Sequence, residues 1–271
     1  MNIDTLRTDG FVTVQYPPNL RTLVMTAMAS WQAFCKLPPE EKSKLSQQTD
    51  RTVDFGYMRR TDQGKAADDK ELFHLVGKNL PQIYRQAADI ADPRATLFIK
   101  AIDALLRESA PLVREFAHEV ERVYHLTGFE DEVMSSQDNW TFRLLHYFGG
   151  AKILAYRHPD RKGFTLHLNE SAPGGEYLGF DHIWRPWTVS EKQTIIFPSM
   201  ELQYRSAGML KALWHQILST PETIHTGRYA MVAFIDFRHS HRVEGRTQDF
   251  EPGFNYDIPF EEFRKVFVPR P

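Results

Sequence analysis

Apolar residues recur at two different spacings along the chain, and the spacing changes near residue 138. Before that point they recur every three or four positions, as in an amphipathic helix, within residues 20–34, 37–45 and 94–124. The second of these stretches opens with two prolines and two glutamates, which favour the start of a helix. The third contains Pro111, where we expect an interruption. The pattern therefore predicts a helical first half.

After residue 138 the apolar segments are short and rich in β-branched and aromatic residues, and glycine or proline separates them. The predicted strands are 141–148, 164–168, 176–180, 194–197, 213–218 and 229–237. Many short strands without helices between them favour an antiparallel sandwich or barrel.

The two patterns together predict a mainly β protein with a helical N-terminal part. We expect a helical region at 1–137 packed on a β-sandwich core at 138–240. A tail at 241–271 should end in a short helix near 259–267. The charged segment 54–70 is expected to be a long loop, and the chain to form one cooperative unit, because no flexible linker divides it.

Composition narrows the possible partners. Of the 271 residues 42% are hydrophobic and 25% are charged, as in ordinary globular proteins. A net charge of -2 without a basic run argues against a nucleic-acid partner, and no apolar run is long enough to span a membrane. The single cysteine, Cys35, excludes an internal disulfide framework and a cysteine-based zinc site. The polar N-terminus does not resemble a signal peptide, so we expect a cytoplasmic protein. Its oligomeric state cannot be inferred.

One tripeptide carries candidate metal chemistry. In an extended segment residues two apart share a face, so His158 and Asp160 can offer a nitrogen and an oxygen to one ion. A third ligand could come from His215, in the strand-like segment 213–218, and Arg228 opens a later apolar strand. Two histidines and a carboxylate cover one face of octahedral Fe(II), which leaves positions for a 2-oxo acid and dioxygen. A buried arginine requires an anion, and it could bind the far carboxylate of that acid.

The order of these features resembles that of the iron(II)/2-oxoglutarate-dependent oxygenases of the isopenicillin N synthase-like family. The segments that carry the resemblance span most of the chain: DGFVTV (9–14), WQAFCKLPPEEKSKL (31–45), FGYMRR (55–60), RLLHYF (143–148), RHPDRKGFTLHLNES (157–171), GGEYL (174–178), IIFPSMELQYRSAGMLKALWHQI (195–217) and RYAMVAF (228–234). The resemblance implies a double-stranded β-helix (jelly-roll) sandwich flanked by α-helices.

The resemblance also implies roles for individual residues. His158, Asp160 and His215 would bind Fe(II), with 2-oxoglutarate as co-substrate and dioxygen as oxidant. Arg228 would bind the distal carboxylate of 2-oxoglutarate, and Tyr147 could be a second donor to it. Ala230 departs from the family, which usually has a serine there, so that hydrogen bond is absent or comes from Tyr147 or Thr226. Other departures are Leu145 in place of asparagine, and Pro198 and Ser199 in place of glycine and aspartate.

Several other groups are weaker candidates. Asp236, His239 and His241 could collect a metal, but their spacing is more typical of a solvated loop. His167 and His182 could line a substrate pocket or lie on the surface. The run MRR (58–60) could bind an anionic substrate, although an exposed charged run is the commoner outcome.

The sequence thus favours an oxygenase that hydroxylates a small molecule while 2-oxoglutarate is decarboxylated to succinate. One alternative is a family member that catalyses oxidative cyclisation or desaturation, with or without 2-oxoglutarate. Another is a catalytically silent jelly-roll that binds a small molecule or a protein. The substrate itself cannot be inferred.

Overall fold

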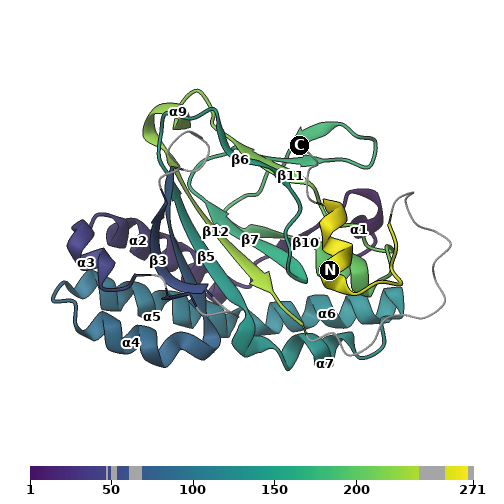
Figure 1. Ribbon diagram of the computed structural model, residues 1–271, viewed down its shortest axis with the longest axis horizontal. Coiled ribbons are helices and arrows are strands. Elements are labelled where there is room, and N and C mark those ends of the chain that lie inside the picture. Colours follow the sequence, from purple (N-terminus) through teal and green to yellow (C-terminus); the bar gives the residue numbers. More distant parts are fainter. Residues whose placement is uncertain (47, 50–53, 61–68, 238–253, 268–271) are drawn as a thin grey trace.

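Two antiparallel sheets face each other in the computed structural model, and helices cover the outer face of the larger sheet (Figure 1). The structure describes residues 1–46, 48–49, 54–60, 69–237 and 254–267. The predicted fold class is confirmed, and the strands that the structure describes do not close into a barrel. Among the described residues, no helix has the length and apolar character needed to cross a membrane.

Within the described residues, the larger sheet has eight strands in the order β1-β10-β7-β12-β5-β4-β3-β2. Their bounds are Val12–Gln15 (β1), Gln48–Thr49 (β2), Asp54–Arg60 (β3), Lys70–Val76 (β4), Thr141–Tyr147 (β5), Phe164–Glu170 (β7), Gln193–Pro198 (β10) and Arg228–Ile235 (β12). The described part of the smaller sheet has four strands in the order β6-β11-β8-β9. Their bounds are Ile153–His158 (β6), Gly175–Leu178 (β8), Trp184–Pro186 (β9) and His215–Leu218 (β11).

The long helices follow the predicted pattern closely. They are Pro18–Cys35 (α2), Pro39–Ser43 (α3), Pro93–Glu108 (α5) and Ala110–Tyr124 (α6). The expected interruption between the two helices falls at Ser109. A new helix, α6, begins just after it, and Pro111 lies in the first turn of α6, where proline is tolerated. Shorter helices are Thr5–Thr8 (α1), Leu80–Ala88 (α4), Phe129–Met134 (α7), Met200–Arg205 (α8), Thr223–Thr226 (α9) and Phe260–Phe263 (α10), with 3-10 turns at Gly77–Asn79, Gln137–Asn139 and Arg264–Phe267.

The expected long loop at 54–70 was wrong at both ends. Strand β3 occupies its first seven residues, and β4 begins at Lys70. The charged residues of this segment are typical of a loop, so its strands were not predicted. In the fold Phe55 and Tyr57 are buried, and Tyr57 packs edge-on against Phe34 of α2. The first half of the chain, predicted to be helical, therefore also contributes β1, β3 and β4 to the large sheet.

Two apolar layers hold the sheets in place. The first lies between the large sheet and the helices, where Trp31 and Phe34 of α2 pack on Phe98 of α5, and Trp31 Nε1 donates to Leu145 O at 3.1 Å. The second lies between the two sheets and includes Leu145, Trp187 and Phe197. This inner layer surrounds the candidate site.

Candidate metal centre

The two candidate histidine ligands lie opposite each other in the small sheet. His158 ends β6, His215 begins β11, and the two residues are cross-strand partners. Such partners point to the same face of a sheet, and their ring centroids are 4.5 Å apart. Asp160 follows β6 by two residues, and its Oδ1 lies 3.7 Å from His158 Nε2 and 3.9 Å from His215 Nε2. One ligand atom from each residue therefore falls within 4.8 Å of the others.

Backbone carbonyls orient both imidazole rings. His158 Nδ1 lies 2.6 Å from Tyr156 O, and His215 Nδ1 lies 3.1 Å from Leu213 O. A carbonyl only accepts, so each Nδ1 carries the hydrogen and each Nε2 presents a lone pair toward Asp160. This is the arrangement in which a neutral histidine binds a metal through Nε2.

Asp160 is held in a similar way. Thr165 Oγ1, on the neighbouring strand β7, donates to Asp160 Oδ2 at 2.7 Å. Ser199 Oγ lies 3.1 Å from the same hydroxyl and donates to it, since the Thr165 hydrogen is already used. The backbone is fixed as well, because Met200 N donates to Asp160 O at 2.9 Å. These contacts leave Oδ1 directed at the two imidazoles.

Burial sets the charge state of His215. It lowers the pKa of His215 to about 4, and this effect outweighs the opposing attraction of Asp160. His215 is therefore neutral near pH 7, as a metal ligand must be. The side chain of His158 is 46% exposed, so the cluster opens to solvent on that side.

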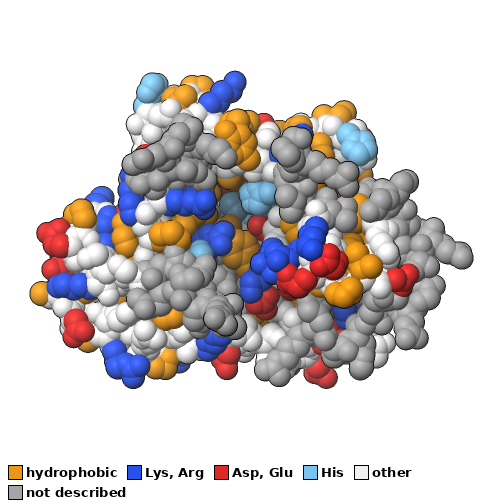
Figure 2. All heavy atoms as spheres, viewed as in Figure 1, with side chains coloured by type: hydrophobic (Ala, Val, Ile, Leu, Met, Phe, Trp, Pro, Cys, Tyr) orange, Lys and Arg blue, Asp and Glu red, His pale blue; other side chains and the backbone are white. Residues whose placement is uncertain are grey.

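A cavity of about 60 Å³ joins the cluster to Arg228. Besides His158, Asp160, His215 and Arg228, its lining comprises Arg143, Leu145, Tyr147, Ala155, Thr165, His167, Trp187, Phe197, Ile217, Ala230, Val232 and Phe234. The molecular face in Figure 2 is hollowed near its centre, with histidine side chains visible there and lysine or arginine side chains nearby.

Arg228 is buried at the start of β12 and is only partly satisfied. Its Nη2 is hydrogen-bonded to Glu170 Oε2 at the end of β7. Its Nε and Nη1 are buried and, among the described residues, have no hydrogen-bond acceptor. Tyr147 is the cross-strand partner of Arg228 and lines the same cavity. The Thr226 hydroxyl donates to the backbone carbonyls of Glu222 and Gly227. The side chain of Glu170, the cross-strand partner of Ala230, contacts Arg228.

The weaker candidates lie in varied places. His167 is buried in the cavity, whereas His182 is exposed in a turn. Arg59 of the MRR run forms an ion pair with Asp69 at 2.6 Å and stacks on Phe148, away from the metal cluster. Of the alternative metal group, His239 and His241 lie outside the described residues.

Two residues of the site, Thr165 and Glu170, were not anticipated from the sequence. Thr165 lies in the strand that follows Asp160, and a two-residue alternation puts it on the same face as His167, so its orientation could have been anticipated. Glu170 had no comparable signal, because its contact with Arg228 joins residues 58 positions apart.

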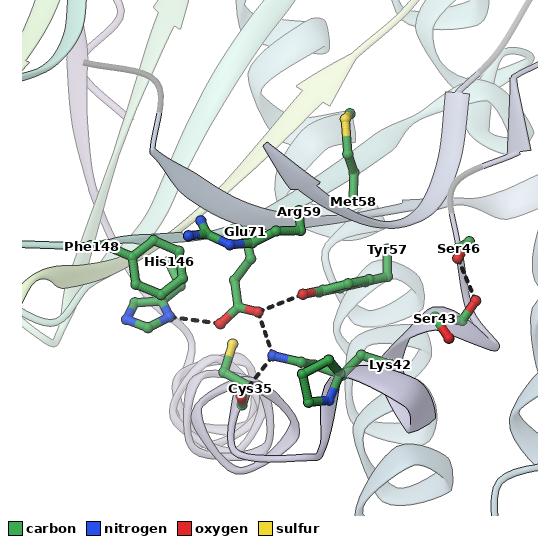
Figure 3. A pocket seen from close by; sticks show the side chains of 11 residues that line it. Cys35, Lys42, Ser43, Ser46, Tyr57, Met58, Arg59, Glu71, His146 and Phe148 are labelled. Carbon is green, nitrogen blue, oxygen red and sulfur yellow. Dashed lines mark hydrogen bonds and ion pairs between the residues drawn. The ribbon is translucent and has the colours of Figure 1, made fainter. Parts of the chain in front are cut away.

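A second cluster with metal-ligand types lies on the helix side of the large sheet (Figure 3). Cys35, Glu71 and His146 each place one ligand atom within 4.8 Å of the others. Lys42 Nζ, however, lies 2.6 Å from Glu71 Oε2 and 3.0 Å from Cys35 O, and the Tyr57 hydroxyl donates to the same Oε2 at 2.8 Å.

The ammonium group of Lys42 already supplies the cation that Glu71 requires. Burial, reinforced by Glu71, raises the pKa of the Cys35 thiol far above its usual range, so the sulfur is not the thiolate that binds metals. We interpret this cluster as a structural ion pair.

Comparisons with protein-family models and with curated proteins found no match. Solved structures do match over most of the chain. The rice dioxygenase for auxin oxidation (DAO) superposes with a TM-score of 0.71 at 16% identity, covering 97% of this chain and 86% of that one. A Neurospora crassa protein in complex with alpha-KG and thymine superposes with a TM-score of 0.71 at 18% identity, covering 97% and 88%. A Caulobacter crescentus protein described as belonging to the 2OG-Fe(II) oxygenase family gives 0.70 at 23% identity, covering 86% and 79%. The chain therefore has the fold of these oxygenases, as its sequence resemblance implied.

Proposed function

We propose that this protein is an iron(II)/2-oxoglutarate-dependent oxygenase acting on a small molecule. His158, Asp160 and His215 would bind the iron, and Arg228 the distal carboxylate of 2-oxoglutarate. The observation that carries the proposal is that one cavity connects the oriented ligand cluster with a buried arginine, whose Nε and Nη1 have no acceptor among the described residues. The solved Neurospora crassa complex with alpha-KG (2-oxoglutarate), which has the same fold, supports this assignment.

The donor set suits Fe(II). Two neutral imidazoles and one carboxylate cover one face of an octahedral ion and leave the opposite positions open. Bound there with 2-oxoglutarate, Fe(II) would supply the oxidising chemistry that uses dioxygen and releases succinate and CO2. The protein's own residues orient the ligands and the co-substrate and keep water out.

The cavity wall performs the last of these tasks. Leu145, Trp187 and Phe197 are all buried and line the space between the ligand cluster and Arg228. In such an apolar environment the attraction between Arg228 and a carboxylate is stronger than in water. Tyr147, the cross-strand partner of Arg228, would donate a second hydrogen bond to the same carboxylate.

The expected substrate class rests on the proteins that share the fold of this chain. Thymine is bound in the Neurospora crassa complex, and the rice enzyme is named for auxin oxidation. We therefore expect a small organic substrate near the exposed side of His158. Hydroxylation is the simplest outcome, and oxidative cyclisation or desaturation would use the same iron and co-substrate residues.

Anaerobic addition of Fe(II) and 2-oxoglutarate tests the proposal. We expect an absorption band at about 500 nm, which arises when a 2-oxo acid chelates Fe(II). Asp160→Ala should lose the band, whereas Arg228→Met should bind iron but need much more 2-oxoglutarate. A wild-type protein that binds no iron and shows no band would overturn the proposal and favour a catalytically silent jelly-roll.

A further inference from the structure

A buried carboxylate already occupies part of the arginine that the co-substrate would use. Glu170 Oε2 contacts Arg228 Nη2 and lies 3.0 Å from His167 Nε2. The side chains of Arg228, Glu170 and His167 are 0%, 10% and 4% exposed, respectively. Solvent therefore screens the charges of this trio only weakly.

Arg228 has a counter-charge before any ligand enters. Burial acts to raise the pKa of Glu170, but His167 and Arg228 outweigh it and hold that pKa below its ordinary value. Glu170 is therefore ionised near neutral pH, and the Arg228–Glu170 pair carries no net charge.

The same arginine nevertheless has room for a second acceptor. Nε and Nη1 of Arg228 are buried without a partner among the described residues, and unsatisfied buried N–H groups are costly. A carboxylate that binds these atoms would share one guanidinium with Glu170. Two carboxylates beside a single cation repel each other in a weakly screened site.

We propose that binding of 2-oxoglutarate brings one proton into this site, taken up from solvent by His167. This inference rests on the proposed function. Because Nε2 of His167 is engaged by Glu170, the proton adds to Nδ1, and no other bond changes. The imidazolium then balances Glu170, and Arg228 balances the distal carboxylate. His167 would thus be a positioning residue that acts on the co-substrate through Glu170 and Arg228.

The surroundings of His167 favour it as the proton acceptor. Imidazole is the kind of side chain that gains and loses a proton in the physiological range, whereas contacts with His167 and Arg228 keep Glu170 ionised. The ring of Trp187 lies next to the imidazoles of His167 and His215, with centroid distances of 5.1 Å and 5.9 Å.

The other charged or titratable side chains that line the cavity lie on several elements. They are Arg143 and Tyr147 on β5, Arg228 on β12, His158 on β6, His215 on β11, and Asp160 in the β6–β7 connection. Arg143 Nε donates to His74 Nε2 at 2.6 Å on the adjacent strand β4, so this guanidinium is anchored on the side of the cavity away from β7.

Calorimetry can count the proton directly. Protein loaded anaerobically with Fe(II), or with redox-silent Mn(II), is titrated with 2-oxoglutarate at pH 8 in two buffers of different ionisation enthalpy. The difference in binding heat gives the number of protons taken up, and we expect about one. Because one proton is taken up on binding, the dissociation constant should rise by about tenfold per pH unit in this alkaline range.

Matched variants separate this effect from general damage. His167→Gln can still donate to Glu170 but cannot titrate, and Glu170→Gln removes the repulsion, so both should bind 2-oxoglutarate with no proton uptake. His182→Gln, at an exposed position, should retain the wild-type proton. Wild-type binding without proton uptake, or uptake that persists in His167→Gln, would overturn the inference while leaving the oxygenase proposal intact. No binding of 2-oxoglutarate at all would overturn both.

Discussion

The two oxygens of Asp160 have different surroundings, and this difference defines the candidate site at the scale of single residues. Oδ2 accepts the Thr165 hydroxyl at 2.7 Å, while Oδ1 faces the Nε2 atoms of both histidines. A carboxylate with one oxygen held by a neighbour loses less rotational freedom when the other binds a metal. Thr165 therefore prepares Asp160 as a one-oxygen ligand.

Thr165→Val removes this hydroxyl with little change in shape. We expect the affinity for Mn(II) or Fe(II) to fall by about 10- to 100-fold, the usual cost of losing a hydrogen bond to a ligand. Titration calorimetry under anaerobic conditions measures it. Thr22→Val, on the exposed side of α2, is the matched control and should bind as wild type does. An unchanged affinity in Thr165→Val would contradict this role.

Residue spacing explains which parts of the site could be anticipated. His158 and Asp160 share a face because they are two apart in an extended segment, a local property that the sequence displays. Their meeting with His215 depends on the pairing of β6 with β11, and it was the family resemblance that connected them. Glu170 remained hidden, since its contact with Arg228 depends on the β7–β12 register and its bulge.

At the scale of elements, Glu71 joins parts of the fold that the sequence did not connect. From β4 it accepts hydrogen bonds from Lys42 of α3, Tyr57 of β3 and His146 of β5. The long helices could be predicted because their apolar period is local. Strands β3 and β4 could not be predicted in this way. Their charged residues are typical of a loop in the sequence, and only the fold shows that buried partners, such as those of Glu71, compensate these charges.

Glu71 should make stability depend on acid pH. Burial acts to raise its pKa, but hydrogen bonds from His146, Lys42 and Tyr57 lower it from 4.5 to about 2. Because the folded pKa is the lower one, the stabilisation is complete above the unfolded pKa and is lost as pH falls from about 5 to about 2. The shift corresponds to roughly 3 kcal/mol at neutral pH.

Urea unfolding of Glu71→Gln across pH tests this. The variant should be less stable than wild type by roughly 3 kcal/mol at pH 7, and the gap should narrow steadily as pH falls below about 5. Glu40→Gln, at an exposed position of α3, should show no such trend. A gap that stays constant down to pH 3 would mean that Glu71 acts through packing alone.

At the scale of the whole molecule, the proposed metal centre couples the two sheets. His158 and His215 belong to the small sheet, whereas Asp160 is anchored through Thr165 to β7 of the large one. A metal bound by all three residues would hold the sandwich together at its open side. Unfolding separates these ligands, so the metal would stabilise the folded state by mass action.

Differential scanning calorimetry should therefore detect the metal as a rise in Tm. At a free metal concentration of 100 times the Kd the gain is about 2.7 kcal/mol, which for a chain of this size raises Tm by roughly 5–10 °C. A chelator should reverse the shift, and Asp160→Ala should abolish it. Cys35→Ala removes a potential ligand of the second cluster and should keep the shift, because Lys42 already neutralises Glu71 there. Loss of the shift in Cys35→Ala but not in Asp160→Ala would place the metal on the helix side of the large sheet instead.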